Sequence, residues 1–213
     1  MADALSPNIV LTGFMGTGKT AVGRRLATMT GRTFVDLDAE IIAKHGDISD
    51  MFAHGGEERF RAAEREVVAE TAPKRNQVIA TGGGTMLDQD NVVAFLGAEV
   101  FTLTADPEEI HQRVLADGIA SRPLLADSED VPATIATMLD ERKDAYGKFT
   151  AVDTTGKSID QVVDALRDAG APIEREQTLD PKTSKDRTNQ LLYGVLAVAA
   201  VIAVILLILV LTF

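Results

Sequence analysis

The sequence contains no cysteine, so disulfide bonds and thiolate metal sites are excluded. Positive charge is scarce as well: 21 lysines and arginines stand against 32 aspartates and glutamates, giving a formal net charge of −11. This balance disfavours binding to a nucleic acid backbone, and we expect no nucleic-acid partner. The three histidines lack the spacing of metal ligands and are interpreted as solvated surface residues. The N-terminal segment lacks the apolar stretch of a signal peptide.

The 213 residues, 46% of them hydrophobic and 25% charged, suit one globular domain with an appendage. Short apolar runs predict strands at 8–12, 33–36, 77–80, 99–104 and 150–153. Helical patterns predict helices over 20–28, 57–71, 107–115 with Asp106 as cap, and up to 168 with Ser158 as cap. Strands that alternate with helices imply a parallel sheet with helices on both faces. Ligands of such sheets bind beyond the carboxyl ends of the strands.

The octapeptide GFMGTGKT at residues 13–20 fits the phosphate-binding pattern G-x-x-x-x-G-K-[ST]. It lies between a predicted strand and a predicted helix, which is the setting that this loop requires. Gly13, Gly16 and Gly18 let backbone N–H groups approach phosphate oxygens. Lys19 can supply charge to the β- and γ-phosphates, and the Thr20 hydroxyl can ligate Mg²⁺. The loop predicts a nucleotide binder and leaves the second substrate open.

Two carboxylates, Asp36 and Asp38, end the predicted strand at 33–36. Alternation along a strand places both on one side, beside the phosphate loop. One can hold Mg²⁺ through water, and the other can accept a hydrogen bond from a substrate hydroxyl and help to remove its proton. Alternatively, Asp38 caps the next helix.

Three glycines at 82–84 follow a predicted strand, and we favour a role in which their exposed backbone meets a ligand over a plain turn. Arg61 and Glu64 are three residues apart on a predicted helix, where an ordinary surface pair is the default interpretation. Arg122 lies in a stretch over 116–132 whose composition fits a mobile cover, which could bring this arginine to a transferring phosphoryl group. A solvated loop arginine is the alternative.

Arg142 ends a further predicted helix and can fork onto a carboxylate, or it can lie on a solvated charged face.

In order and spacing, the motifs together resemble the shikimate kinase family, which is related to the nucleoside monophosphate kinases. The resemblance covers residues 6–170 and rests on 13–20, 34–38, 46–52 with 56–57, 60–61 with Glu64, 79–84, 122–125, and 141–142 with Tyr146.

This resemblance implies an α/β fold with a five-stranded parallel sheet flanked by helices. It also implies transfer of the γ-phosphoryl group of ATP to the 3-hydroxyl of shikimate, on the pathway to chorismate and aromatic amino acids, with Mg²⁺ as cofactor. Lys19, Asp38 and Arg122 would be catalytic, and Thr20 and Asp36 would hold the metal. ATP would contact Gly13, Gly16, Thr17, Gly18, Lys19, Thr20, Arg113 and Arg122, with Arg113 similar to an arginine that stacks on adenine. Shikimate would contact Asp38, Arg61, Gly82, Gly83, Gly84 and Arg142.

Two rival functions remain at this point. A gluconate kinase of the same architecture would share the phosphate loop but lack the arginines and the triglycine together. A membrane-anchored nucleotide-binding adaptor without turnover would not need a complete acceptor site, whereas Asp38, Arg61 and Arg142 are all present.

The C-terminal segment has no charged residue from Thr188 onward, and 191–213 is almost wholly apolar. As a helix, this segment would span roughly 34 Å, enough to cross a bilayer core of about 30 Å. We predict a domain at 1–170, a polar linker at 171–190 and a transmembrane helix at 191–213; a buried core helix is the alternative. The basic residues before the span predict a single-pass tail anchor with the kinase domain facing the cytoplasm. The family pattern has no such helix, and protein partners stay unassigned.

Overall fold

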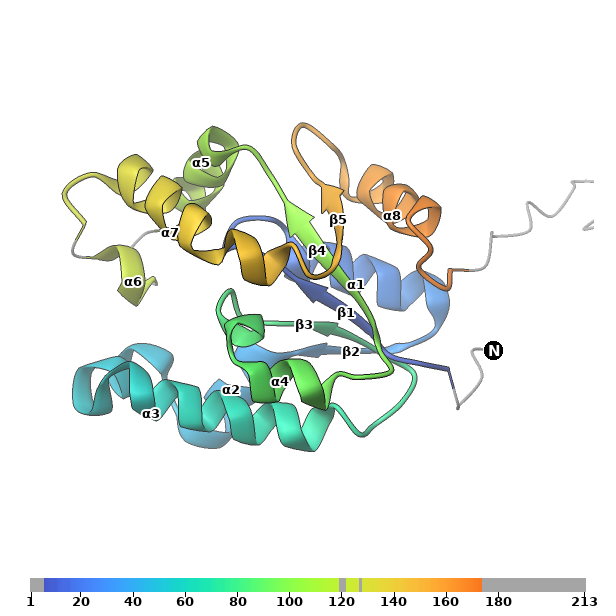
Figure 1. Ribbon diagram of the computed structural model, residues 1–213, viewed down its shortest axis with the longest axis horizontal. Helices are drawn as coiled ribbons and strands as arrows, with labels where there is room; N and C mark the ends of the chain where they lie inside the picture. Colours follow the sequence, from blue (N-terminus) through green and yellow to red (C-terminus); the bar gives the residue numbers. More distant parts are fainter. Residues whose placement is uncertain (1–5, 119–121, 127, 174–213) are drawn as a thin grey trace, which may run out of the picture. The chain divides into compact units, whose positions relative to one another are not determined.

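A five-stranded parallel sheet forms the centre of the fold, in the order β2-β3-β1-β4-β5 (Figure 1). The computed structural model describes residues 6–118, 122–126 and 128–173. The predicted five-stranded parallel sheet is therefore confirmed, and its strands begin or end within one residue of the predicted positions. They are β1 (Ile9–Thr12), β2 (Thr33–Asp36), β3 (Gln77–Ala80), β4 (Glu99–Thr104) and β5 (Thr150–Asp153).

Helices cover both faces of the sheet (Figure 1). Side chains of β1 alternate between the two faces: Ile9 and Leu11 pack with α1 and α8, whereas Val10 packs with α2 and α3. A third cluster joins α5 and α7 around Phe14 of the phosphate loop. The helical elements are α1 (Lys19–Thr30), α2 (Leu37–His45), α3 (Ile48–Thr71), the 3₁₀ turn η1 (Thr85–Leu87), α4 (Gln89–Ala94), α5 (Pro107–Asp117), α6 (Pro123–Ala126), α7 (Val131–Tyr146) and α8 (Ile159–Asp168).

Helix α2 follows β2 without an intervening loop, and this junction corrects the expected arrangement of the two aspartates. Asp36 is both the last residue of β2 and the N-cap of α2, where its side chain accepts a hydrogen bond from the Ala39 N–H at 3.4 Å. Asp38 therefore belongs to the first turn of the helix, and strand alternation does not set its direction. The predicted capping role of Asp38 falls to Asp36.

Of the other predicted helix starts, one is confirmed in full and two differ in detail from the structure. Ser158 caps α8 in a reciprocal pair with Gln161, as predicted. Asp106 lies at the cap position of α5, but its side chain makes no cap hydrogen bond. Helix α3 begins at Ile48 and bends at Gly56, whose φ of 66° lies in the left-handed region, so the predicted helix over 57–71 is its second part.

The packed unit extends to Ile173, because Ala171 and Ile173 are 5% and 8% exposed within the core beside α8, whereas the sequence placed the boundary at residue 170. The rest of the predicted linker and the predicted transmembrane helix at 191–213 lie outside the described residues. Within the described part of the chain, no helix is both long and apolar enough to cross a membrane.

Candidate active site

A cavity of about 290 Å³ lies beyond the carboxyl ends of the central strands. Its position matches the expectation for a parallel sheet, because the segments after β1, β2 and β3 all contribute to its wall. Helices α3 and α7 complete the wall on the other side. The lining residues that bear on the chemistry are Asp38, Arg61, Glu64, Gly82, Gly83, Gly84, Arg122 and Arg142.

The phosphate loop takes its shape from glycines that other residues could not replace. Gly13, Gly16 and Gly18 have φ of 129°, 75° and 88°, in the region that side chains disfavour. A Cβ on Gly13 would also lie 2.1 Å from the carbonyl oxygen of Leu103. The loop is closed by Thr17, whose hydroxyl donates to the Phe14 carbonyl at 2.7 Å. Helix α1 begins directly after it, so its N-terminus points toward the loop.

Lys19 and Asp38 influence one another electrostatically at the edge of the cavity. Burial lowers the pKa of Lys19 to about 8, and the Asp38 carboxylate opposes that shift. Burial raises the pKa of Asp38 to about 6, and the Lys19 ammonium opposes this shift in turn. Lys19 Nζ also donates to the Phe14 carbonyl at 2.9 Å. A cation and a carboxylate more basic than usual, each within electrostatic range of the other, are thus available near neutral pH.

Thr20 and Asp36 form the pair that could hold a metal ion. The Thr20 hydroxyl donates to Asp36 Oδ2 at 2.8 Å, and both are oxygen ligands of the kind that Mg²⁺ prefers. The described residues contain no group of three or more histidine, cysteine, aspartate or glutamate side chains that could form a metal cage. Mg²⁺ commonly takes one or two protein ligands and relies on phosphates and water for the rest, so Thr20 and Asp36 would suffice as its protein ligands.

Arg61 and Glu64 form a buried ion pair, which corrects the default interpretation of a surface pair. Glu64 is 1% exposed, and its Oε2 accepts from Arg61 Nη1 at 2.6 Å. Its other oxygen accepts from the Thr85 hydroxyl at 2.6 Å. Exposed Glu57 accepts from Nε and Nη2 of Arg61 at 3.1 and 2.9 Å. Two carboxylates therefore hold the guanidinium at the cavity wall.

The triglycine makes room for these charged side chains. A Cβ on Gly84 would lie 2.3 Å from Nη2 of Arg61, and one on Gly82 would lie 2.8 Å from Oδ1 of Asp38. Gly84 has an ordinary φ of −109°, so close approach and not backbone conformation demands glycine there. Close approach of charged side chains is thus a reason for glycine here that the sequence did not reveal, whereas the predicted contact of the triglycine with a ligand stays a prediction.

Arg142 is buried, so the alternative of a solvated face is wrong. The residue is 8% exposed, its Nη1 donates to the Gly83 carbonyl at 3.4 Å, and its guanidinium lies 5.4 Å from the ring centroid of Phe14. The Tyr146 hydroxyl donates to the same carbonyl at 2.5 Å, and burial raises the pKa of this phenol. Arg61 and Arg142 thus line one cavity from different helices.

Arg122 lines the cavity just before α6. Its Nη2 donates to Asp117 Oδ2 at 3.1 Å, and its buried Nε has no hydrogen-bond partner among the residues that the structure describes. Its charge contributes to the pKa shifts of both Lys19 and Asp38. The structure therefore brings this predicted cover arginine to the cavity wall, within electrostatic range of the phosphate-loop lysine.

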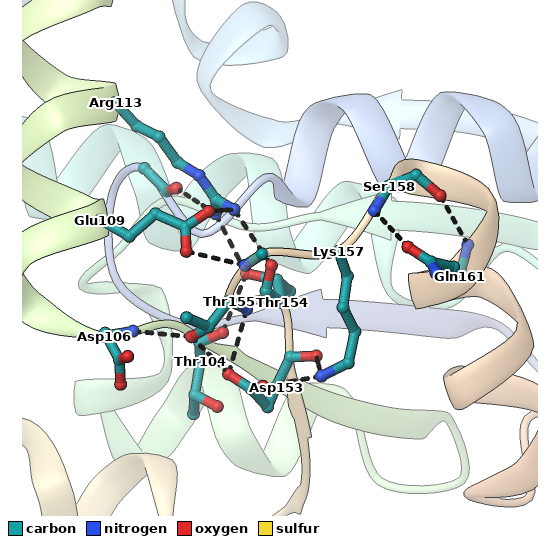
Figure 2. Close-up of polar contacts among 12 residues, drawn as sticks. Thr104, Asp106, Glu109, Arg113, Asp153, Thr154, Thr155, Lys157, Ser158 and Gln161 are labelled. Atoms are coloured by element: carbon teal, nitrogen blue, oxygen red, sulfur yellow. Dashed lines mark hydrogen bonds and ion pairs between the residues drawn. The ribbon is translucent and has the colours of Figure 1, made fainter.

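Arg113 lies apart from the main cavity, beside a second hollow of about 220 Å³ that Thr17, Gly18 and Thr154 also line. Its guanidinium donates to the Gly16 carbonyl at 3.1 Å and to Thr154, and it pairs with Glu109 (Figure 2). Sequence reasoning missed Glu109, Thr85 and Thr154. The four-residue spacing of Glu109 and Arg113 was a readable signal for a helical pair, whereas nothing local pointed to Thr85.

A family model described as shikimate kinase matches residues 15–169. A shikimate kinase of Pelotomaculum thermopropionicum is 46% identical over 162 residues, covering 75% of this chain and 92% of the relative. One of Geobacter metallireducens is 42% identical over 159 residues, covering 73% and 87%.

Solved structures agree with these sequence relatives. A shikimate kinase from Acinetobacter baumannii in complex with shikimate matches with a TM-score of 0.72 and 34% identity, over 77% of this chain and 93% of that one. One from Bacteroides thetaiotaomicron matches with a TM-score of 0.67 and 30% identity, over 76% and 97%. A gluconokinase from Sinorhizobium meliloti matches at 0.52 and 18% identity, over 78% and 93%, a likeness of fold alone.

Proposed function

The chain belongs to the shikimate kinase family, and we propose that its cavity transfers the γ-phosphoryl group of ATP to the 3-hydroxyl of shikimate. It is an ATP-dependent kinase of shikimate, and its product, shikimate 3-phosphate, leads toward the aromatic amino acids. One observation carries the choice of acceptor. Asp38 and the guanidinium groups of Arg61 and Arg142 line the same cavity, which Arg122 also reaches.

The acceptor is a hydroxylated carboxylic acid, and the cavity offers a counterpart for each of its groups. Arg61 and Arg142 would bind the carboxylate, since planar guanidinium groups match carboxylate geometry. Asp38 would accept a hydrogen bond from the reacting hydroxyl and take its proton. Its pKa near 6 keeps it ionised at neutral pH and leaves it more basic than an ordinary aspartate. The backbone of residues 82–84 would contact the acid from the cavity wall.

The triphosphate would be held by the phosphate loop. Lys19 and the backbone N–H groups around Gly16, Thr17 and Gly18 face the charge that spreads over phosphate oxygens during transfer, and Arg122 adds a second cation. Thr20 and Asp36 would hold Mg²⁺, which supplies charge neutralisation to the phosphates when bound. Arg113 stands beside the second hollow, where we propose that the adenosine part lies.

A comparison of acceptors tests this proposal. ADP release with Mg·ATP should be at least about 100-fold more efficient in kcat/KM with shikimate than with gluconate. Gluconate also has a carboxylate, but its open chain would not hold a hydroxyl in place beside Asp38 while that carboxylate is bound. The methyl ester of shikimate, which lacks the negative charge, should be a poor substrate of the wild type. Arg142→Ala should raise the KM for shikimate and reduce the preference for acid over ester, part of which Arg61 would retain.

Three results would contradict the proposal. An unchanged KM for shikimate in Arg142→Ala would remove this arginine from carboxylate binding. Equal use of gluconate and shikimate would favour the rival small-molecule kinase, and binding of ATP without turnover of either acid would favour the adaptor.

We also propose that residues 191–213 anchor the chain in a membrane with the kinase domain in the cytoplasm. The support is the uncharged apolar run and the basic residues that precede it in the sequence. A cut after Ile173 keeps the buried Ala171 and Ile173, so the shortened chain should retain kcat within about twofold. Full-length chain should resist alkaline extraction from membranes. Release of the full-length chain by that treatment would refute the anchor.

A further inference from the structure

A polar network ties helix α5 to the loop between β5 and α8 (Figure 2). Glu109 stands at its centre, one helical turn before Arg113. One carboxylate oxygen of Glu109 pairs with Nη2 of Arg113, and the other accepts from the Gly156 N–H at 2.8 Å. A single side chain of α5 therefore fixes both an arginine and a loop.

Arg113 carries the network on to the phosphate loop. Its Nη1 donates to the Gly16 carbonyl at 3.1 Å and to the Thr154 hydroxyl at 3.0 Å. Its Nη2 also donates to the Thr154 carbonyl at 3.1 Å. Thr154 is 2% exposed and donates to the Thr104 carbonyl at 2.9 Å, so its position is fixed by the sheet. With contacts on several sides, the plane of the guanidinium is set by the surrounding protein.

The hollow of about 220 Å³ lies where these parts meet. Thr17 and Gly18 of the phosphate loop line one side, and Arg113, Thr154 and Lys157 line another. Lys157 forms an ion pair with Asp153, and Glu109 neutralises Arg113. Because both cations are already paired, this hollow suits a neutral, planar group better than a further phosphate.

We propose that Glu109 is a positioning residue for the nucleoside part of ATP, acting through Arg113 and the loop at 154–157. This inference rests on the proposed function, because it takes the phosphate loop to hold the triphosphate of the same nucleotide. Glu109 does not touch the nucleotide. It keeps the guanidinium plane and the Gly156 turn, whose φ is 63°, in the arrangement that forms the hollow.

The test separates the nucleoside from the phosphates. Glu109→Gln keeps the size of the side chain but loses the charge that pairs with Arg113. We expect its Kd for ADP, measured by calorimetry, to rise roughly tenfold. Its Kd for inorganic triphosphate, which has no nucleoside, should change less than about twofold, and so should the KM for shikimate. Glu108→Gln is the matched control, because the adjacent Glu108 is exposed and contacts Gln112.

A second variant keeps the test decisive if Glu109→Gln does not fold. Arg113→Lys retains the charge but loses the planar guanidinium with its several N–H donors. It should therefore reproduce the selective loss of ADP binding. An equal loss of ADP and triphosphate binding would overturn the proposal, because Glu109 would then act on the phosphate loop through Gly16. Unchanged ADP binding in the folded variants would overturn it too. Failure of wild-type turnover with shikimate would instead count against the proposed function, since the binding experiment contains no acid.

Discussion

The two ends of the active site are built by different means. At the nucleotide end, glycines with positive φ shape the phosphate loop, and Arg113 binds mostly to backbone carbonyls and a loop threonine. At the acceptor end, Arg61 and Glu64 hold one another from a helix, and the glycine at 84 has an ordinary backbone conformation. Backbone groups are prominent at the first end, beside Lys19 and the Glu109–Arg113 pair, whereas paired side-chain charges dominate the second.

This difference distinguishes phosphate binding, which the fold itself provides, from acceptor binding, which depends on particular side chains. A loop made of backbone N–H groups recognises phosphate in any nucleotide kinase, and the likeness to a gluconokinase at 18% identity is a likeness of fold. Paired guanidinium groups and a buried carboxylate can be changed without altering the backbone. We therefore expect loss of the phosphate-loop lysine to abolish turnover, and loss of the arginines at the acceptor end to act mainly on acid binding.

The largest effect is expected for Lys19→Ala. Loss of the cation that faces the phosphates should lower kcat on the order of 10³-fold, measured as ADP release. Lys148→Ala, which removes an exposed lysine remote from the cavity, is the control. If Lys19→Ala kept a tenth of the wild-type kcat, the assigned role of the nucleotide end would be wrong.

Asp38→Asn should come next, with kcat reduced about 100-fold or more and ATP affinity close to normal. The pH profile adds a second measurement. Asp38 must be ionised to act as a base, and its pKa is about 6, so kcat/KM should fall as the pH drops through 6. Lys19 loses its charge as the pH rises through its pKa of about 8, so kcat/KM should fall there as well. An acidic limb that persists unchanged in Asp38→Asn would assign that limb to another group.

Gly84→Ala tests whether space for Arg61 is what the triglycine provides. Its Cβ would lie 2.3 Å from the guanidinium, so we expect the KM for shikimate to rise at least about tenfold while the KM for ATP stays the same. In Gly83→Ala the nearest atom would be 3.5 Å away, an ordinary contact, and the increase should be smaller. Equal effects of the two variants would argue against the space requirement.

The smallest effects on stability and on the KM for shikimate should come from substitution of the two carboxylates that hold Arg61. Glu64→Gln removes the buried charge, and we expect a loss of about 2 kcal/mol in the free energy of unfolding together with a higher KM for shikimate. Glu57→Gln removes an exposed partner and should change stability by less than about 0.5 kcal/mol. Chemical denaturation of both variants measures the difference. Similar losses would mean that burial does not distinguish the pairs.

Local pattern predicted the strands well, because each is a short apolar run between polar segments. It gave no bounds for α2 and offered Asp38 only as an alternative cap, since this helix starts directly after the last strand residue and no loop residue announces it. It also began α3 too late, because Gly55 and Gly56 read as a break, whereas the chain bends there and continues. The stretch interpreted as a cover contains α6 and the start of α7.

Which residues belong to the site was easier to predict than which residues contact one another there. Arg61, Arg142 and Asp38 stand out as charges beside recognisable motifs. The contacts of Glu64 with Thr85 and of Glu109 with Gly156 join residues 21 and 47 positions apart, and only the folded chain brings these together. The roles assigned to the site residues stay predictions until the variants are measured.

Asp36 ties folding and chemistry to a single carboxyl group. It is the last residue of β2, it caps helix α2, and its Oδ2 accepts a hydrogen bond from the Thr20 hydroxyl. Asparagine could retain the cap but would be a poorer neighbour for a divalent ion, whereas glutamate would keep the charge and lose the cap geometry. No single exchange satisfies all three demands, so this position should tolerate less variation than its moderate burial suggests.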